Sequence, residues 1–212
     1  MNSRFAPLLK VLGGATLAIV TLQIVAVSIK RYVTQTEAGP APILGNAFAD
    51  PFLMLHVLGA VVALSIGPLQ FVAALRERWP GLHRATGRIY VAATALATPT
   101  GLILALGTTT GPVAGAGFAL LGLLWGIFTW LGLRAILARR IAEHRQWMLR
   151  SYAMAAAAIT LRLMLPASFM LGFDFAIAYP VIAWACWLSN LALVEYWIRR
   201  RRPTASPSPA FA

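Results

Sequence analysis

Three histidines are the side chains best suited to hold a cofactor, and each stands near the start of an apolar segment. His83 and His144 precede two such segments, so facing helices could present two imidazoles to one haem iron. That six-coordinate arrangement suits electron transfer. Guanidinium groups that would neutralise the haem propionates follow both histidines closely: Arg84, Arg88, Arg145 and Arg150. Alternatively, the histidines lie at the membrane interface and bond Glu77, Glu143, the backbone or lipid phosphate.

Arg162 has the highest free-energy cost of membrane insertion in the chain, because its charged side chain lies inside an apolar segment. Counting from Trp147 at 1.5 Å per residue puts it roughly 22 Å across a bilayer, in the outer half. His56 is predicted at a similar depth, so the two side chains could form an external substrate-binding site for an electron donor, a quinone or an anionic ligand. His144 and Arg162 are 18 positions apart, about five helical turns, and therefore share a helix face. Alternatively, Arg162 only extends toward the headgroups and anchors its helix.

Six apolar segments of about 20 residues would position these side chains, and each is long enough to cross a bilayer as a helix. A hydrophobic content of 59%, a charged content of 11% and a mean hydropathy of +0.75 indicate a membrane protein. The predicted segments are Leu8–Ile29, Phe52–Leu75, Ile89–Leu106, Gly117–Leu137, Trp147–Phe173 and Ala176–Trp197.

We therefore predict an all-α polytopic membrane protein, a bundle of six transmembrane helices over residues 1–202. Residues 203–212 have the composition of a disordered cytoplasmic tail. The first segment could also be a cleaved signal peptide. Its length, and the Lys30 and Arg31 that follow it, favour a retained helix.

The positive charges set the predicted orientation, because positively charged loops stay on the cytoplasmic side. Arginines cluster between the second and third segments, around the connection of the fourth and fifth, and after the sixth. Both termini are therefore predicted to be cytoplasmic, in a bacterial inner membrane. The net charge of +12 is divided among these loops, which indicates contact with the lipid bilayer and argues against a nucleic-acid partner.

Several other function classes lack their motifs. Cys186 is the only cysteine, which excludes an intramolecular disulfide and a thiolate metal cluster. The sequence contains no phosphate loop, nucleophile elbow or HExxH stretch, so neither a hydrolase nor a nucleotide-driven pump is indicated.

Polar residues and prolines within the segments predict local features of the bundle. Gln70 and Asn190 are expected to form hydrogen bonds between helices. Bends are expected where prolines interrupt the second, third and fifth segments, at Pro68, Pro99 and Pro166.

A short internal repeat relates the second and third segments to the fourth and fifth. A His-Arg pair, an arginine four or five positions later and then a tyrosine occur at His83 to Tyr90 and again at His144 to Tyr152. Two copies of one helical hairpin related by an axis along the membrane normal would place both histidines at one depth. Two short matches in an arginine-rich chain could also arise by chance.

The most specific strings of the chain are Gly67-Pro68-Leu-Gln70-Phe, Pro80-Gly-Leu-His83-Arg84-x-x-Gly87-Arg88-x-Tyr90 and His144-Arg145-x-Trp147-Met148-x-Arg150-Ser-Tyr152, followed by Thr160-Leu-Arg162 and Trp184-Ala-Cys186-Trp187-x-x-Asn190. With them the chain resembles a bacterial membrane family known as domain of unknown function 2306, from about Leu55 to Glu195. The resemblance implies a multi-pass membrane protein and no particular activity.

A second resemblance covers only residues 56 to 102. His56-Val-Leu-Gly59, Gln70 and His83-x-x-x-Gly87-Arg88 are similar to a helix pair of transmembrane dihaem cytochromes that carry electrons from ascorbate or serve ferric reduction. That likeness implies haem-ligand positions for His56 and His83. Those proteins use four histidines for two haems, whereas this chain has three, so it implies at most one haem here.

The sequence therefore favours a b-type haem or quinone-linked electron carrier, with His83 and His144 as metal ligands and His56 and Arg162 as a substrate site. A cofactor-free transporter or lipid-binding protein, in which Arg162 meets an anionic substrate, is the second hypothesis. A membrane assembly or scaffold protein is the third. Whether the chain is an enzyme is left open.

Overall fold

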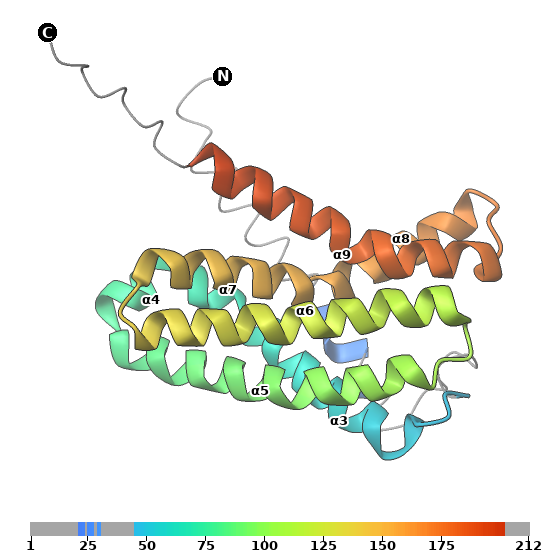
Figure 1. The fold of residues 1–212 in the computed structure, drawn as a ribbon, viewed down its shortest axis with the longest axis horizontal. Helices are drawn as coiled ribbons and strands as arrows, with labels where there is room; N and C mark the ends of the chain where they lie inside the picture. The colour runs from blue at the N-terminus through green and yellow to red at the C-terminus, as the bar shows by residue number, and fades with distance from the viewer. Residues whose placement is uncertain (1–20, 24, 28, 31–44, 202–212) are drawn as a thin grey trace, which may run out of the picture.

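The computed structural model describes residues 21–23, 25–27, 29–30 and 45–201, and the predicted all-α class is confirmed for this part of the chain (Figure 1). No strand occurs in these residues. From residue 45 onward the elements are α3 (Ala49–Ile66), the 3₁₀ helix η2 (Pro68–Phe71), α4 (Ala73–Arg78), α5 (Pro80–Leu106), α6 (Pro112–Leu137), α7 (Ile141–Ala155), α8 (Ala157–Met170) and α9 (Phe175–Arg200).

Five helical stretches of the described residues are long and apolar enough to cross a membrane, which confirms a multi-pass membrane protein. They are Ala49–Phe71, Pro80–Leu106, Pro112–Leu137, Ile141–Met170 and Phe175–Arg200, and they match the second to sixth predicted segments. The first predicted segment, Leu8–Ile29, lies largely outside the described residues. The tail over 203–212 lies entirely outside them. The count of six helices and the single domain over residues 1–202 therefore stay predictions.

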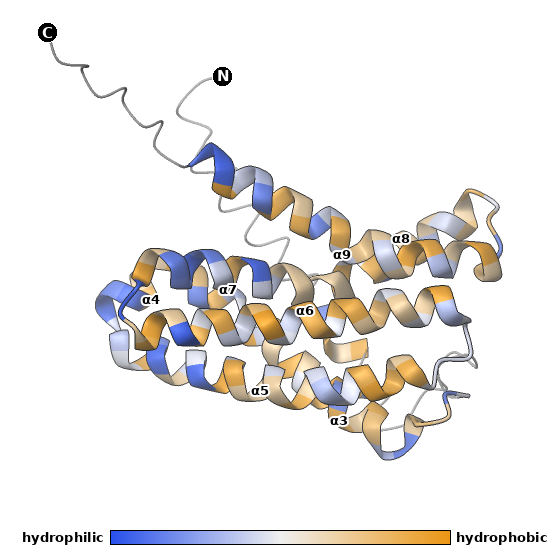
Figure 2. Ribbon diagram, in the orientation of Figure 1, coloured by the Kyte–Doolittle hydropathy of each residue, from blue (hydrophilic) through white to orange (hydrophobic). Residues whose placement is uncertain are grey.

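Polar residues gather at one end of the bundle, which we call the arginine-rich end. It consists of η2, α4, the first turns of α5 and α7 and the last turn of α6, and it is the blue region at the left of Figure 2. Residues beyond this end along the helices are mostly apolar (Figure 2). Both α5 and α7 start at the arginine-rich end, so these two helices run parallel (Figure 1).

The chain packs as neighbouring helices, with α3 against α5, α5 against α6 and α6 against α7, while α9 lies along α6, α7 and α8. Small side chains allow close approach in the core. A Cβ built on Gly59 of α3 would lie only 2.7 Å from the carbonyl oxygen of Ala93 on α5. Ala63 and Ala97, from the same two helices, are fully buried. Close contact through small residues is typical of membrane helices.

Prolines and glycines set the helix ends. Pro80 and Pro112 lie in the first turns of α5 and α6, where the missing backbone N–H has no intrahelical acceptor to lose. Gly111, just before α6, has a φ of 91°, in the region that glycine adopts without steric cost. Gly111 and Pro112 together therefore allow a tight connection between α5 and α6.

The second span is broken at Gly67, where α3 ends and Pro68 begins η2. Gly67 admits the Tyr152 ring, because a Cβ there would lie 2.4 Å from two ring atoms. After the break, the Gln70 amide donates to the hydroxyl of Thr86 on α5 at 2.7 Å. The predicted hydrogen bond from Gln70 to another helix is therefore confirmed.

The fifth span is broken at Ala156, between α7 and α8, whereas Pro166 lies within α8 and Pro99 within α5. Asn190 of α9 bridges this break. Its amide donates to the Ala153 carbonyl at 3.2 Å and accepts from the Thr160 hydroxyl at 3.0 Å. The predicted interhelical bonding of Asn190 is confirmed, but the sequence did not predict a break at Ala156.

Candidate functional site

A closed ring of hydrogen bonds lies between α5, α6 and α7. The Tyr90 hydroxyl accepts from the Trp125 indole N–H at 3.3 Å and bonds the Ser151 hydroxyl at 2.8 Å. Ser151 bonds the Thr129 hydroxyl at 2.7 Å, and Thr129 donates to the carbonyl of Trp125 at 2.8 Å. All four side chains are buried, and Ser151 is 0% exposed.

The bond from Thr129 to the Trp125 carbonyl determines which hydroxyl donates and which accepts in the other bonds of the ring. Thr129 has one hydroxyl proton and uses it on the Trp125 carbonyl, so Ser151 must donate to Thr129. Tyr90 must then donate to Ser151. Each hydroxyl therefore donates once and accepts once, which is a fully satisfied buried network. Such networks fix a unique arrangement of the helices that carry them.

The ring also sets the relative level of the two predicted haem ligands. His83 precedes Tyr90 by seven positions and His144 precedes Ser151 by seven. Seven residues are about two turns, so each histidine shares a face with its partner in the ring and lies about 10 Å toward the helix start. Because α5 and α7 run parallel, both histidines lie at one level of the arginine-rich end.

The surroundings of the two imidazoles differ. His144 Nδ1 lies 2.8 Å from the carbonyl oxygen of Gly132 on α6. Because a carbonyl only accepts, this nitrogen carries the proton, and Nε2 of a neutral His144 keeps its lone pair. His83 Nδ1 is buried and has no hydrogen-bond partner in the described part of the chain.

The predicted propionate partners fall into two groups. Arg84, Arg88 and Arg145 are exposed. Arg150 is only 12% exposed and forms a two-pronged ion pair with Glu195 of α9, in which Nη2 donates to Oε2 at 3.1 Å. Its guanidinium carbon also lies 4.6 Å from the centre of the Trp147 ring. Arg150 therefore ties α7 to α9.

Arg76 is a cation near His83 that the sequence interpretation did not include among the site residues. It lies on α4, is partly buried, and donates to the carbonyl of Gln70 at 3.2 Å. The signal was present, because Gly67 and Pro68 mark an early helix end. A chain that turns there can bring Arg76 back toward the start of α5.

His56 and Arg162 form a second polar location, nearer the opposite end of the bundle. His56 Nδ1 lies 2.8 Å from the Ala97 carbonyl oxygen on α5, and its ring packs over Gly101. Arg162 donates to the Ala158 carbonyl at 3.1 Å, and its charge reaches His56. His56 lies far along the bundle from His83, and a shared substrate site of His56 and Arg162 stays a prediction.

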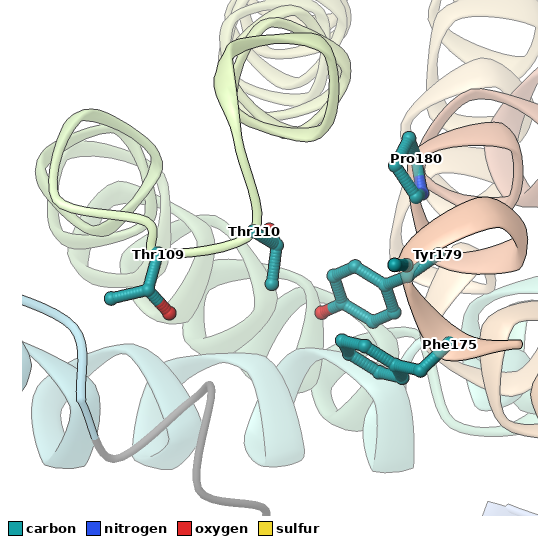
Figure 3. Close-up of a pocket in the computed structure, with 6 residues that line it drawn as sticks. Thr109, Thr110, Phe175, Tyr179 and Pro180 are labelled. Carbon is teal, nitrogen blue, oxygen red and sulfur yellow. The ribbon is translucent and has the colours of Figure 1, made fainter.

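Two cavities lie at the opposite end, near the connection of α5 and α6. One of about 310 Å³ is lined by Thr109 and Thr110 of that connection and by Phe175, Ala176, Tyr179 and Pro180 of α9 (Figure 3). The other, of about 440 Å³, lies between α5 and α6 and is lined mainly by small residues. None of the predicted site residues lines either of these two cavities.

The donors available for a metal are limited in the described residues. No cluster of three or more histidine, cysteine or carboxylate side chains occurs there. The pairing of His83 and His144 as metal ligands stays a prediction.

The comparison with known proteins identifies the family. A profile described as "Predicted membrane protein (DUF2306)" matches residues 53–198, from early in α3 to the end of α9. Neither the curated proteins nor the solved structures give a match. The matched region contains all the predicted site residues and the hydrogen-bonded ring. Because the match covers more than half of the chain, the chain belongs to the DUF2306 family of predicted membrane proteins.

Proposed function

We propose that this protein is a membrane electron carrier that holds one b-type haem between His83 and His144 at the arginine-rich end. The observation that carries the proposal is the register of α5 and α7. The bond between Tyr90 and Ser151 links the two helices, which both pack against α6, and each histidine lies seven residues before its ring partner.

The protonation of the imidazoles supports axial ligation. The carbonyl of Gly132 holds the proton of His144 on Nδ1, so the lone pair of Nε2 is available to iron. The buried Nδ1 of His83 has no hydrogen bond in the described residues. A buried polar atom without a partner points to a missing group. When bound, haem would supply reversible one-electron transfer, and the protein would supply both ligands.

Positive charge at this end favours a cofactor with carboxylates. The helices α5 and α7 both start there, and the start of a helix carries a partial positive charge. Arg76 is partly buried on α4, which packs against the start of α5, so we assign propionate pairing to Arg76 first. Arg145 remains a candidate, whereas Arg150 is engaged with Glu195, and Arg84 and Arg88 lie on a different face of α5 from His83.

We assign the exchange of electrons with a donor or a quinone to His56 and Arg162. Their helices, α3 and α8, share the contact of Leu64 with Ile159. We also propose that the arginine-rich end faces the cytoplasm of a bacterial inner membrane, because basic loops are retained there. The second candidate function is transport or binding of an anionic substrate at Arg162.

The experiment is to produce the protein with ample haem, purify it in detergent, and measure the haem-to-protein ratio and the reduced-minus-oxidised spectrum. We expect about one haem per wild-type chain and loss of haem in His83→Ala and in His144→Ala. His56→Ala is the matched control, because it removes the same side chain from the other location. It should keep its haem.

A conservative variant separates ligation from folding. In His83→Met a thioether replaces one imidazole, so haem should be retained with a raised reduction potential. A colourless wild-type protein, or equal haem loss in His56→Ala, would remove the proposal. In that case an anionic ligand whose thermal stabilisation of the protein disappears in Arg162→Ala would support the second candidate.

A further inference from the structure

We infer that the outer face of α5 at the arginine-rich end binds an anionic phospholipid, with Arg84 and Arg88 as its phosphate ligands. Both residues are exposed. They are four positions apart on one helix, so their side chains lie about one turn, roughly 6 Å, from each other. Two guanidinium groups at that spacing can bind one phosphate between them.

These arginines point away from the interior site. At 100° per residue, Arg84 lies about 100° and Arg88 about 140° around α5 from His83. Tyr90, on the inner face near His83, is 1% exposed, whereas Arg84 and Arg88 lie among exposed residues. A ligand that both arginines hold together therefore lies on the outside of the bundle.

An apolar stripe continues from the arginines toward the middle of the membrane. Ala92, Ala95 and Pro99 lie about 180°, 120° and 160° around α5 from His83, on the face of the two arginines, and all three are exposed. Ile89 and Leu96, which are 51% and 40% exposed, border this stripe at about 240° and 220° from His83. This stripe offers a smooth surface for an acyl chain directly below the two guanidinium groups. Trp79, an exposed aromatic residue just before α5, marks the interface level, as tryptophans in membrane proteins do.

The charge of the pair has no internal compensation in the described residues. Neither Arg84 nor Arg88 forms an ion pair there, whereas Arg140 pairs with Glu143 and Arg150 pairs with Glu195. A negative phosphate with attached acyl chains complements the two arginines and the apolar stripe together, and a free phosphate complements only the arginines.

The test measures binding of phosphatidylglycerol, phosphatidylcholine and inorganic phosphate to the purified protein in detergent by native mass spectrometry and by thermal stabilisation. We expect binding of phosphatidylglycerol. At about 1 kcal/mol per arginine, the Arg84→Gln/Arg88→Gln variant should bind it about 30-fold more weakly. Arg84→Lys/Arg88→Lys keeps both charges and should keep most of the binding.

Arg140→Gln is the matched control, because it removes an exposed arginine of the same end that already pairs with Glu143. It should leave lipid binding unchanged. Equal binding of phosphatidylcholine, equal stabilisation by inorganic phosphate, or an equal loss in Arg140→Gln would each overturn the inference. The outcome does not depend on haem, so the inference and the proposed function can fail separately.

Discussion

Removing the Tyr90 hydroxyl should destabilise the bundle more than removal of a hydroxyl at its surface. Tyr90→Phe keeps the aromatic side chain but deletes the hydroxyl, which is one acceptor and one donor of the closed network. The indole N–H of Trp125 then loses its acceptor, although the Trp125 side chain is only 5% exposed and water has little access to it. Ser151 keeps its bond to Thr129.

The magnitude follows from the two bonds lost. A buried donor left without a partner costs about 1 to 3 kcal/mol in water-soluble proteins. Hydrogen bonds between membrane helices contribute about 0.6 kcal/mol on average and at most about 1.7 kcal/mol. We therefore expect Tyr90→Phe to lower the free energy of unfolding by about 1 to 2 kcal/mol.

A double-mutant cycle gives the more specific test. In Tyr90→Phe/Ser151→Ala the ring is already open after the first change, so the second change should cost less than it does alone. We expect a coupling energy of about 0.5 to 1.5 kcal/mol. Equilibrium unfolding in mixed micelles, followed by circular dichroism, measures each variant.

Tyr196→Phe is the matched control, because it removes the same hydroxyl from a side chain that is 54% exposed. That variant should change the free energy of unfolding by less than about 0.5 kcal/mol. If Tyr90→Phe is no less stable than Tyr196→Phe, or if the effects of Tyr90→Phe and Ser151→Ala simply add, the closed ring does not hold these helices together.

Three further predictions concern packing and charge. Gly59→Ala should destabilise by at least about 1 kcal/mol because its Cβ would meet the Ala93 carbonyl oxygen, whereas Gly81→Ala, with nothing within 4 Å, should be neutral or stabilising in thermal unfolding; the reverse order would refute this packing. Glu195→Gln should lower the free energy of unfolding by about 1 to 3 kcal/mol, because it removes the charged partner of an Arg150 side chain that is only 12% exposed. Arg140→Gln should lower it by less than about 1 kcal/mol, and equal values by denaturant titration would argue against the tie between α7 and α9. Asn190→Leu should speed amide exchange around Ala156, since it removes both bonds across that break, and unchanged protection would show that the amide does not stabilise it.

Hydropathy predicted the membrane class and the second to sixth segments, because about 20 apolar residues in a row have few other stable placements. The interhelical bonds of Gln70 and Asn190 were predicted for a similar reason, since a polar group in lipid needs a partner. Both inferences rest on local sequence.

The break at Ala156 and the ring around Tyr90 could not be predicted in this way. An alanine carries no signal for a helix break, and the break is bridged by Asn190, which lies 34 positions later. The ring joins residues 90, 125, 129 and 151 from three helices. Single serines and threonines in apolar segments are common, so only the packing of the helices shows which of them meet.

The predicted haem and substrate sites stay predictions. The repeat suggested that His83 and His144 share a depth, and the register of α5 and α7 gives the physical basis for that expectation. The arginines were grouped by sequence proximity alone, although helix faces separate Arg84 and Arg88 from His83. Arg76 was missed because the second segment, although a bend was expected at Pro68, was predicted to continue to Leu75 as one helix, whereas α3 ends at Ile66.

Cross-linking of positions 83 and 144 tests most directly the claim that the two histidines face each other at one level. In a Cys186→Ala background, His83→Cys/His144→Cys should be joined by a short bifunctional thiol reagent, and mass spectrometry of the digest should detect the linked peptides. Arg150→Cys/Glu195→Cys, at a pair in contact, is the positive control, and His56→Cys/His144→Cys should give no link. Linkage at the positive control without linkage between positions 83 and 144 would contradict the account.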